Sequence, residues 1–118
     1  MSGSAPVTVI ETPEFLEMAG RIMDEDERGL LVDYLAHNPR AGDIVPGTGG
    51  VRKLRWALQG RGKRSGARII YFYHNGDMPL FALTAYAKNE RADIGQSARN
   101  DLQRLTNILI TCYARKKP

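Results

Sequence analysis

The chain has 118 residues, 42% of them hydrophobic, and a formal net charge of +4 at pH 7. This size predicts a single globular domain over residues 1–118, and one cysteine, Cys112, excludes an internal disulfide and a thiolate metal cluster. No apolar run approaches the roughly 20 residues that cross a bilayer, and no secretory signal is recognisable. We therefore expect a cytoplasmic protein without a membrane partner. The single cysteine is expected to fill core space.

The first part of the chain predicts a strand and two helices. Residues 1–6 are expected to form a flexible tail, and residues 7–10 are a short β-prone run. Thr12-Pro13 suits the start of one helix, with a capping residue followed by a proline. Residues 24–27, with Asp first and Glu last, resemble the capping box that opens a second helix. Asn38-Pro39 is expected to end this second helix. Apolar residues recur at helical spacing in both: Phe15, Leu16, Ala19, Ile22 and Met23, then Leu30, Leu31, Tyr34 and Leu35 as the buried stripe.

The second part predicts a sheet and a final helix. After a connection rich in proline and glycine, strands are expected over residues 51–58, 68–73 and 80–87, with Asn75-Gly76 as a strong hairpin signal between the last two. The last two strands are apolar on both faces, as covered central strands are. Apolar residues then step by three and four along a helix: Ala98, Leu102, Leu105, Leu109 and Cys112, broadened by Ile108, Ile110 and Tyr113. The fold class is therefore α+β: an N-terminal strand and two helices, then a small antiparallel-rich sheet of three further strands and a C-terminal helix.

The positive charge is concentrated in one stretch. Residues 44–76 contain no acid, and residues 52–68 hold seven of the 17 Lys and Arg side chains: Arg52, Lys53, Arg55, Arg61, Lys63, Arg64 and Arg68. The remaining ten cations stand against 13 acids, so the rest of the chain is mildly acidic. Such a local excess is typical of a polyanion site that releases counterions when phosphates bind, and a solvated basic loop is the alternative.

Alternation along the strand at residues 51–58 separates two faces. Arg52, Leu54, Trp56 and Leu58 share one face, which looks like the packed side. Lys53 and Arg55 therefore point together toward a solvent-filled cleft, where Arg68 of the neighbouring strand can join them. Three cations are predicted to converge on one surface, and residues 59–66, with three glycines among three cations, are expected to form a mobile loop.

Three segments carry a resemblance to a known family: T-G-G-V-R-K-L-R from Thr48, S-G-A-R-I-I-Y from Ser65, and Y-A-K-N-E from Tyr86. They resemble the RelE/HigB toxins of bacterial type II toxin–antitoxin pairs, most specifically over residues 47–93, with the flanking helices in matching order. The resemblance points to the HigB branch more than to RelE itself. It implies a RelE-like fold.

The resemblance also implies an activity and partners. The activity is that of an mRNA interferase, a metal-independent and ribosome-dependent endoribonuclease that cleaves mRNA in the ribosomal A site and inhibits translation. The implied partners are the 70S ribosome, mRNA and a cognate HigA-like helix-turn-helix antitoxin, and contact with DNA is expected only through that antitoxin. No cofactor is expected, and His37 and His74 are interpreted as structural because neither has a partner at metal-ligand spacing.

Site residues follow from position in the family pattern. Lys53, Arg55 and Arg68 match basic residues used for cleavage on the second and third strands, and Lys88 is a fourth catalytic candidate. Two positions depart from RelE, because Asn89 replaces an arginine and Gly95 replaces a late tyrosine; Lys88, Glu90 or the 61–64 loop are alternatives for the proton transfers. The RNA-binding candidates are Arg52, Arg61, Lys63, Arg64, Tyr86 and Asn89.

These residue types suit RNA cleavage without a metal. An enzyme can align the 2′-hydroxyl with the adjacent phosphate and stabilise the charge that grows at phosphorus. Arg55 and Arg68 suit bidentate phosphate binding, and Lys53 suits a point charge or a proton donor. Tyr86 either stacks on a base or packs in the sheet.

Two other function classes compete with the ribonuclease. A non-enzymatic RNA-binding module, or an inactive toxin homologue, would have the same basic surface. A DNA-binding regulator is disfavoured because no predicted helix carries the basic charge, whereas a recognition helix needs its cations on helical turns.

Overall fold

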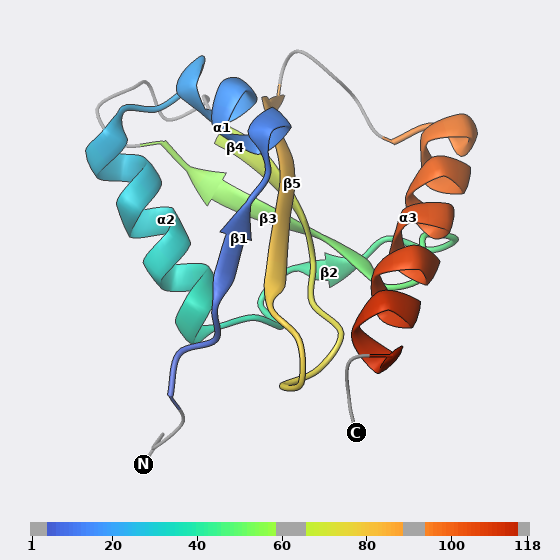
Figure 1. The fold of residues 1–118 in the computed structure, drawn as a ribbon. Coiled ribbons are helices and arrows are strands. Elements are labelled where there is room, and N and C mark those ends of the chain that lie inside the picture. Colours follow the sequence, from blue (N-terminus) through green and yellow to red (C-terminus); the bar gives the residue numbers. More distant parts are fainter. Residues whose placement is uncertain (1–4, 59–65, 89–93, 116–118) are drawn as a thin grey trace.

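The computed structural model describes residues 5–58, 66–88 and 94–115, which form a five-stranded sheet with helices on both faces (Figure 1). The elements follow the predicted order: β1 (Val9–Glu11), α1 (Pro13–Gly20), α2 (Glu25–His37), β2 (Asp43–Ile44), β3 (Val51–Ala57), β4 (Gly66–Phe72), β5 (Leu80–Ala87) and α3 (Gln96–Arg115). The α+β class is confirmed. Only β2 was not predicted, because two residues are too short to show a period-two pattern.

The sheet has the strand order β1-β5-β4-β3-β2. β1 pairs parallel with β5, and the remaining neighbours are antiparallel. The predicted β4–β5 hairpin is confirmed, although residues 73–79 connect the two strands and the Asn75 side chain accepts the Asp77 N–H there at 2.8 Å. No helix in the described ranges is long and apolar enough to cross a membrane.

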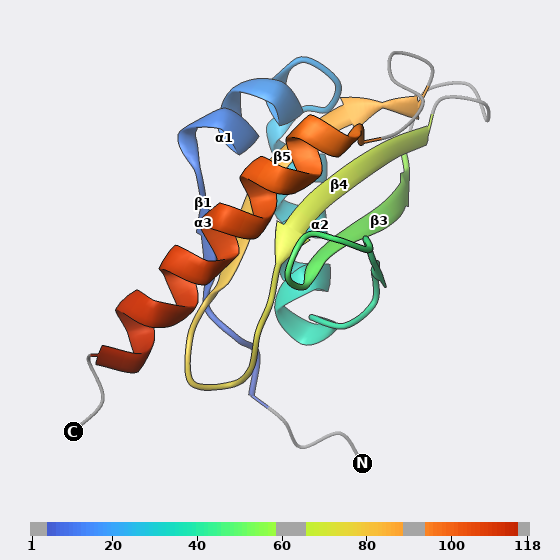
Figure 2. The same cartoon turned by 90° about the vertical axis from the view of Figure 1, so that its right-hand side faces the viewer.

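Two hydrophobic clusters lie on the two faces of this sheet. α1 and α2 pack on one face, where Phe15, Leu31 and Leu35 are fully buried with Ile69 and Tyr71 of β4. α3 crosses the other face (Figure 2), and its leucines pack on a second cluster built from Val51, Ile70 and Phe72, among others. The prediction that the central strands are covered on both sides is therefore confirmed.

Apolar positions on the predicted faces of all three helices lie at the surface, among them Leu16, which is 43% exposed, and Ile108, which is 58% exposed. Leu30 is 58% exposed and Tyr34 is 39% exposed, so the buried stripe of α2 is narrower than its apolar residues suggest. The Tyr34 ring instead packs beside Trp56, with the two ring centroids 5.7 Å apart. Cys112 is exposed, and the expectation that it fills core space is wrong, because the face of α3 that packs on the sheet holds Leu105, Leu109 and Tyr113.

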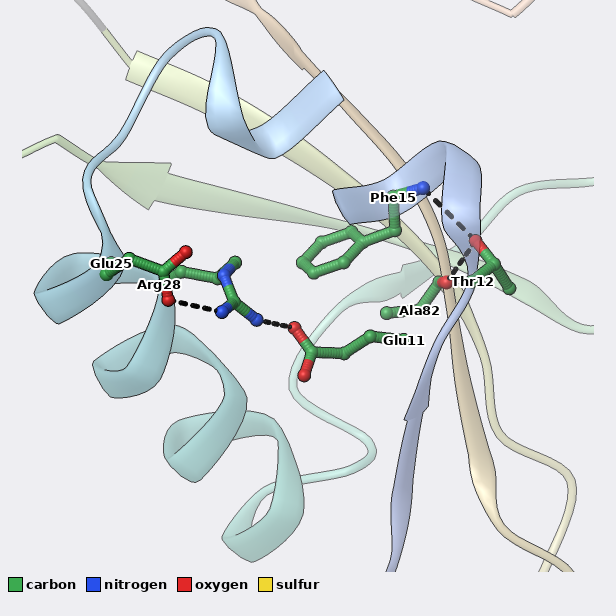
Figure 3. A network of polar contacts seen from close by, with 6 residues as sticks. All are labelled: Glu11, Thr12, Phe15, Glu25, Arg28 and Ala82. Carbon is green, nitrogen blue, oxygen red and sulfur yellow. Dashed lines mark hydrogen bonds and ion pairs between the residues drawn. The ribbon is translucent and has the colours of Figure 1, made fainter. Parts of the chain in front are cut away.

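Polar contacts join the first elements to the sheet (Figure 3). Thr12 caps α1 by accepting the Phe15 N–H at 3.1 Å, and its hydroxyl lies 2.9 Å from the Ala82 carbonyl of β5, to which it donates. The Arg28 guanidinium of α2 donates hydrogen bonds to the carboxylates of Glu25 and Glu11, and these bonds, with Glu25 the larger cause, raise the pKa of Arg28. The second predicted cap is confirmed as well, since the Asp24 carboxylate accepts the Glu27 N–H at 2.9 Å.

The segment between β2 and β3 holds α3 in place. The Thr48 hydroxyl donates to the Val45 carbonyl at 2.7 Å and accepts the Val51 N–H at 3.0 Å, which closes the turn. The Thr106 hydroxyl of α3 donates to the Thr48 carbonyl at 3.0 Å. Gly49 has a positive φ of 78°, and a Cβ there would lie 2.3 Å from the Thr106 hydroxyl oxygen. Only glycine allows α3 to approach the segment so closely.

Candidate RNA-cleaving surface

β3 and β4 place three cations on the side of the sheet that faces α3. Arg55 and Arg68 are direct cross-strand partners, and Lys53 lies two residues before Arg55, opposite Ile70. Arg55 is exposed, whereas Lys53 and Arg68 are partly buried. Like charges directly opposite each other destabilise a strand pair, so the Arg55–Arg68 arrangement carries a cost in the free protein that a bound anion would remove.

Two further predicted residues lie at the same end of the sheet. Tyr86 of β5 is the register partner of Arg68, but its side chain is only 3% exposed and belongs to the cluster beneath α3. Of the two roles considered for it, this burial supports packing. Lys88 directly follows β5 and is exposed.

A cavity of about 460 Å³ opens beside β3, on the side of β2. Three cations (Lys53, Arg55 and Arg99) and one acid (Asp43) contribute to its wall. The other described residues that line it are Ala41, Ile44, Val45, Pro46 and Leu54. Its charged lining fits a phosphate-bearing ligand better than an apolar one.

Arg99 was missed by the sequence analysis because it lies on α3, far from the basic stretch. Its Nε donates to the Ile94 carbonyl at 3.1 Å, and its guanidinium also donates to the Pro46 carbonyl at 3.2 Å. One signal was available: α3 has no acid in its first turn and carries this arginine there, although the positive end of the helix dipole disfavours a cation.

Arg52 lies on the opposite face from the other cations, as alternation predicts. Its guanidinium donates to the carbonyls of Gly42, at 2.7 Å, and Arg40, at 3.2 Å. The Tyr71 hydroxyl accepts the Gly42 N–H and donates to the Pro39 carbonyl, both at 2.8 Å. These contacts hold the segment that leads into β2 and borders the cavity, so the geometry gives Arg52 a structural task.

Other predicted features lie elsewhere. Arg61, Lys63, Arg64 and Asn89 are outside the described residues. A cavity of about 740 Å³ lies at the opposite end of β4 and β5, where the Arg40 guanidinium lies 5.2 Å from the Tyr73 ring centroid, and none of the predicted site residues that the structure describes lines it. In the parts of the chain that the structure describes, no group of three or more His, Cys, Asp or Glu side chains could hold a metal ion.

One protein family matches the part of the chain that carries these cations. The family described as "RelE toxin of RelE / RelB toxin-antitoxin system" matches residues 42–116, which is more than half of the chain. The match contains β2 to β5 and α3, and therefore the opposed arginines and the charged cavity. Toxins of this family have a cognate antitoxin and are generally mRNA-cleaving endoribonucleases. The chain thus belongs to the RelE toxin family of toxin–antitoxin systems.

Proposed function

We propose that this chain is a ribosome-dependent mRNA interferase of the HigB-like branch, which cleaves mRNA in the A site of the 70S ribosome and so inhibits translation in the cytoplasm. The observation that carries the proposal is the cross-strand pair Arg55 and Arg68, with Lys53 beside it on the same face. A HigA-like helix-turn-helix antitoxin would silence the toxin and provide its contact with DNA.

The proposed reaction is transfer of the RNA phosphate to the neighbouring 2′-oxygen. A bond forms between the 2′-oxygen and phosphorus, and the bond from phosphorus to the 5′-oxygen breaks, which leaves a 2′,3′-cyclic phosphate and a 5′-hydroxyl. The 2′-hydroxyl gives its proton to water or to a base supplied by the ribosome, and the 5′-oxygen gains one. Arg55 and Arg68 bind the phosphate oxygens and stabilise the charge at phosphorus, while Lys53 or Lys88 donates the proton to the leaving oxygen.

The chemistry of these side chains supports dependence on the ribosome. Protonated lysine and arginine donate hydrogen bonds but accept no proton, so the cations explain charge stabilisation and protonation of the leaving group more readily than removal of the 2′-proton. The ribosome would align the 2′-oxygen with the bond that breaks, and alignment alone contributes several kcal/mol, of the order of 7–11, in well-oriented reactions. No metal enters this scheme.

The test is primer extension on a message translated in a cell-free extract, beside the same message without ribosomes. We expect the wild-type chain to cut only in the presence of ribosomes. The triple variant Lys53→Ala, Arg55→Ala, Arg68→Ala should lose cleavage by about 10³-fold or more, because removing even one charge-stabilising donor costs about 10²–10³. The matched control removes two exposed cations, Arg21→Ala with Arg104→Ala; Arg21 caps the end of α1 and is ion-paired with Glu17, and Arg104 is ion-paired with Asp101 on α3.

The other outcomes decide between function classes. Cleavage without ribosomes would show a nuclease whose alignment is complete in the protein itself. Normal cleavage by the triple variant would contradict the assignment of the three cations. If the wild-type chain binds RNA but cuts in neither lane, the non-enzymatic RNA-binding module replaces the interferase.

A further inference from the structure

The charged cavity beside β3 extends the RNA-binding surface beyond the opposed arginines. We infer that Arg99 is an RNA-binding residue that, with Lys53 and Arg55, holds the backbone phosphate next to the one being cleaved. This inference rests on the proposed function, because it adds a second phosphate subsite for the same RNA strand.

The positions of the cations separate two subsites. Arg68 pairs with Arg55 on the β4 side of β3, and it is not part of the cavity wall. The cavity lies on the other side of β3, toward β2, and Arg55 contributes to both places. Neighbouring strands are about 4.8 Å apart, so a phosphate over the arginine pair and another in the cavity lie within reach of one RNA backbone.

Two hydrogen bonds hold Arg99 at the cavity. Its guanidinium bridges the Ile94 carbonyl, just before α3, and the Pro46 carbonyl in the segment between β2 and β3. The Thr106 to Thr48 hydrogen bond fixes α3 against the same segment two turns later. The Arg99 side chain is thus positioned before any ligand arrives, which reduces the side-chain entropy lost on binding.

The charge of the cavity favours an anion. Among the described residues, Asp43 is the only acid in the wall, and it is the register partner of Lys53, so its carboxylate offsets part of the charge of that lysine. Arg55 and Arg99 leave the wall net positive, as one or two phosphates would require. A volume of about 460 Å³ is within the range of small-ligand pockets and exceeds the needs of a single phosphate, which fits one nucleotide of a strand.

The test uses a fluorescent single-stranded RNA ten-mer with 2′-O-methyl sugars, which cannot be cleaved through the 2′-oxygen. Its affinity is measured by anisotropy at several salt concentrations for the wild-type chain, Arg99→Gln, Arg99→Lys and the control Arg104→Gln, which removes an exposed cation from the same helix. For Arg99→Gln we expect about 10-fold weaker binding and a salt slope smaller by about 0.7, the value for one lost phosphate contact on a single strand. Arg99→Lys should keep the wild-type slope, and Arg104→Gln should keep both slope and affinity.

Three results would overturn the inference. The first is an Arg99→Gln slope equal to that of Arg104→Gln, and the proposed function would stand if the wild-type chain still cleaves on ribosomes. The second is an equal loss of RNA affinity in Arg99→Lys and Arg99→Gln together with a lower melting temperature of both variants. That result is expected if Arg99 only anchors α3 and does not bind RNA. The third is no binding of the ten-mer by the wild-type chain at low salt, in which case the cleavage assay alone decides the proposed function.

Discussion

At the scale of single residues, the opposed arginines predict a trade between stability and activity. Arg55→Gln removes the like-charge repulsion with Arg68. The free energy of unfolding of the variant should therefore exceed that of wild type by a few tenths of a kcal/mol at low salt, and this difference should vanish near 1 M salt. Cleavage on ribosomes should fall by about 10²-fold, because one charge-stabilising donor is lost. Urea unfolding at two salt concentrations and primer extension measure the two effects.

Arg104→Gln is the matched control for this trade. Arg104 is exposed and ion-paired with Asp101 on α3, so its loss should change stability by less than about 0.5 kcal/mol and leave cleavage unchanged. A clear loss of stability in Arg55→Gln would contradict the repulsion argument and would mean that Arg55 serves the fold.

At the scale of elements, the position of α3 depends on one glycine. Gly49→Ala places a Cβ against the Thr106 hydroxyl and puts alanine at a positive φ, so we expect the free energy of unfolding to fall by about 2–4 kcal/mol. Gly29→Ala is the control, since nothing lies within 4 Å of its Cβ in the interior of α2, and alanine there should add up to about 1 kcal/mol. Urea unfolding of both variants checks this, and an unchanged Gly49→Ala would show that the segment and α3 adjust freely.

At the scale of the whole molecule, stability should fall at alkaline pH through Tyr71. Burial raises the pKa of this phenol above its value of about 10 in the unfolded chain. The contribution of the neutral hydroxyl is therefore fully present below about pH 10 and is lost as the pH rises through the folded-state pKa. Tyr71→Phe should cost about 1–3 kcal/mol at neutral pH, because the Gly42 N–H and the Pro39 carbonyl lose their partner.

The comparison of pH profiles isolates this group. Wild type and Tyr71→Phe differ in this one ionisable group, so the difference between their free energies of unfolding should shrink as the pH rises from about 9 to 11. Urea unfolding across that range measures it. A difference that stays constant would contradict the raised pKa of Tyr71, because a group with the same pKa in the folded and unfolded states leaves the free energy of unfolding independent of pH.

Much of the fold was predictable because its signals are local. The caps at Thr12 and Asp24 act within one helical turn, and the apolar alternation of β4 and β5 reports burial on both faces. The same alternation along β3 predicted that Lys53 and Arg55 share a face. Local pattern failed where the answer depends on what packs opposite, as with Leu30, Tyr34 and Cys112, whose helices leave them at the surface.

By itself the sequence determined the order of the elements, the basic stretch and the side of β3 on which its cations stand, because these follow from periods of two and 3.6 residues and from composition. Only the tertiary structure decided that β1 joins β5 in parallel, that Tyr86 is buried, and that Arg99 reaches the cavity beside Lys53 and Arg55. The physical reason is that such contacts join segments far apart in the chain, and their register and distance are set by the packing of both cores together.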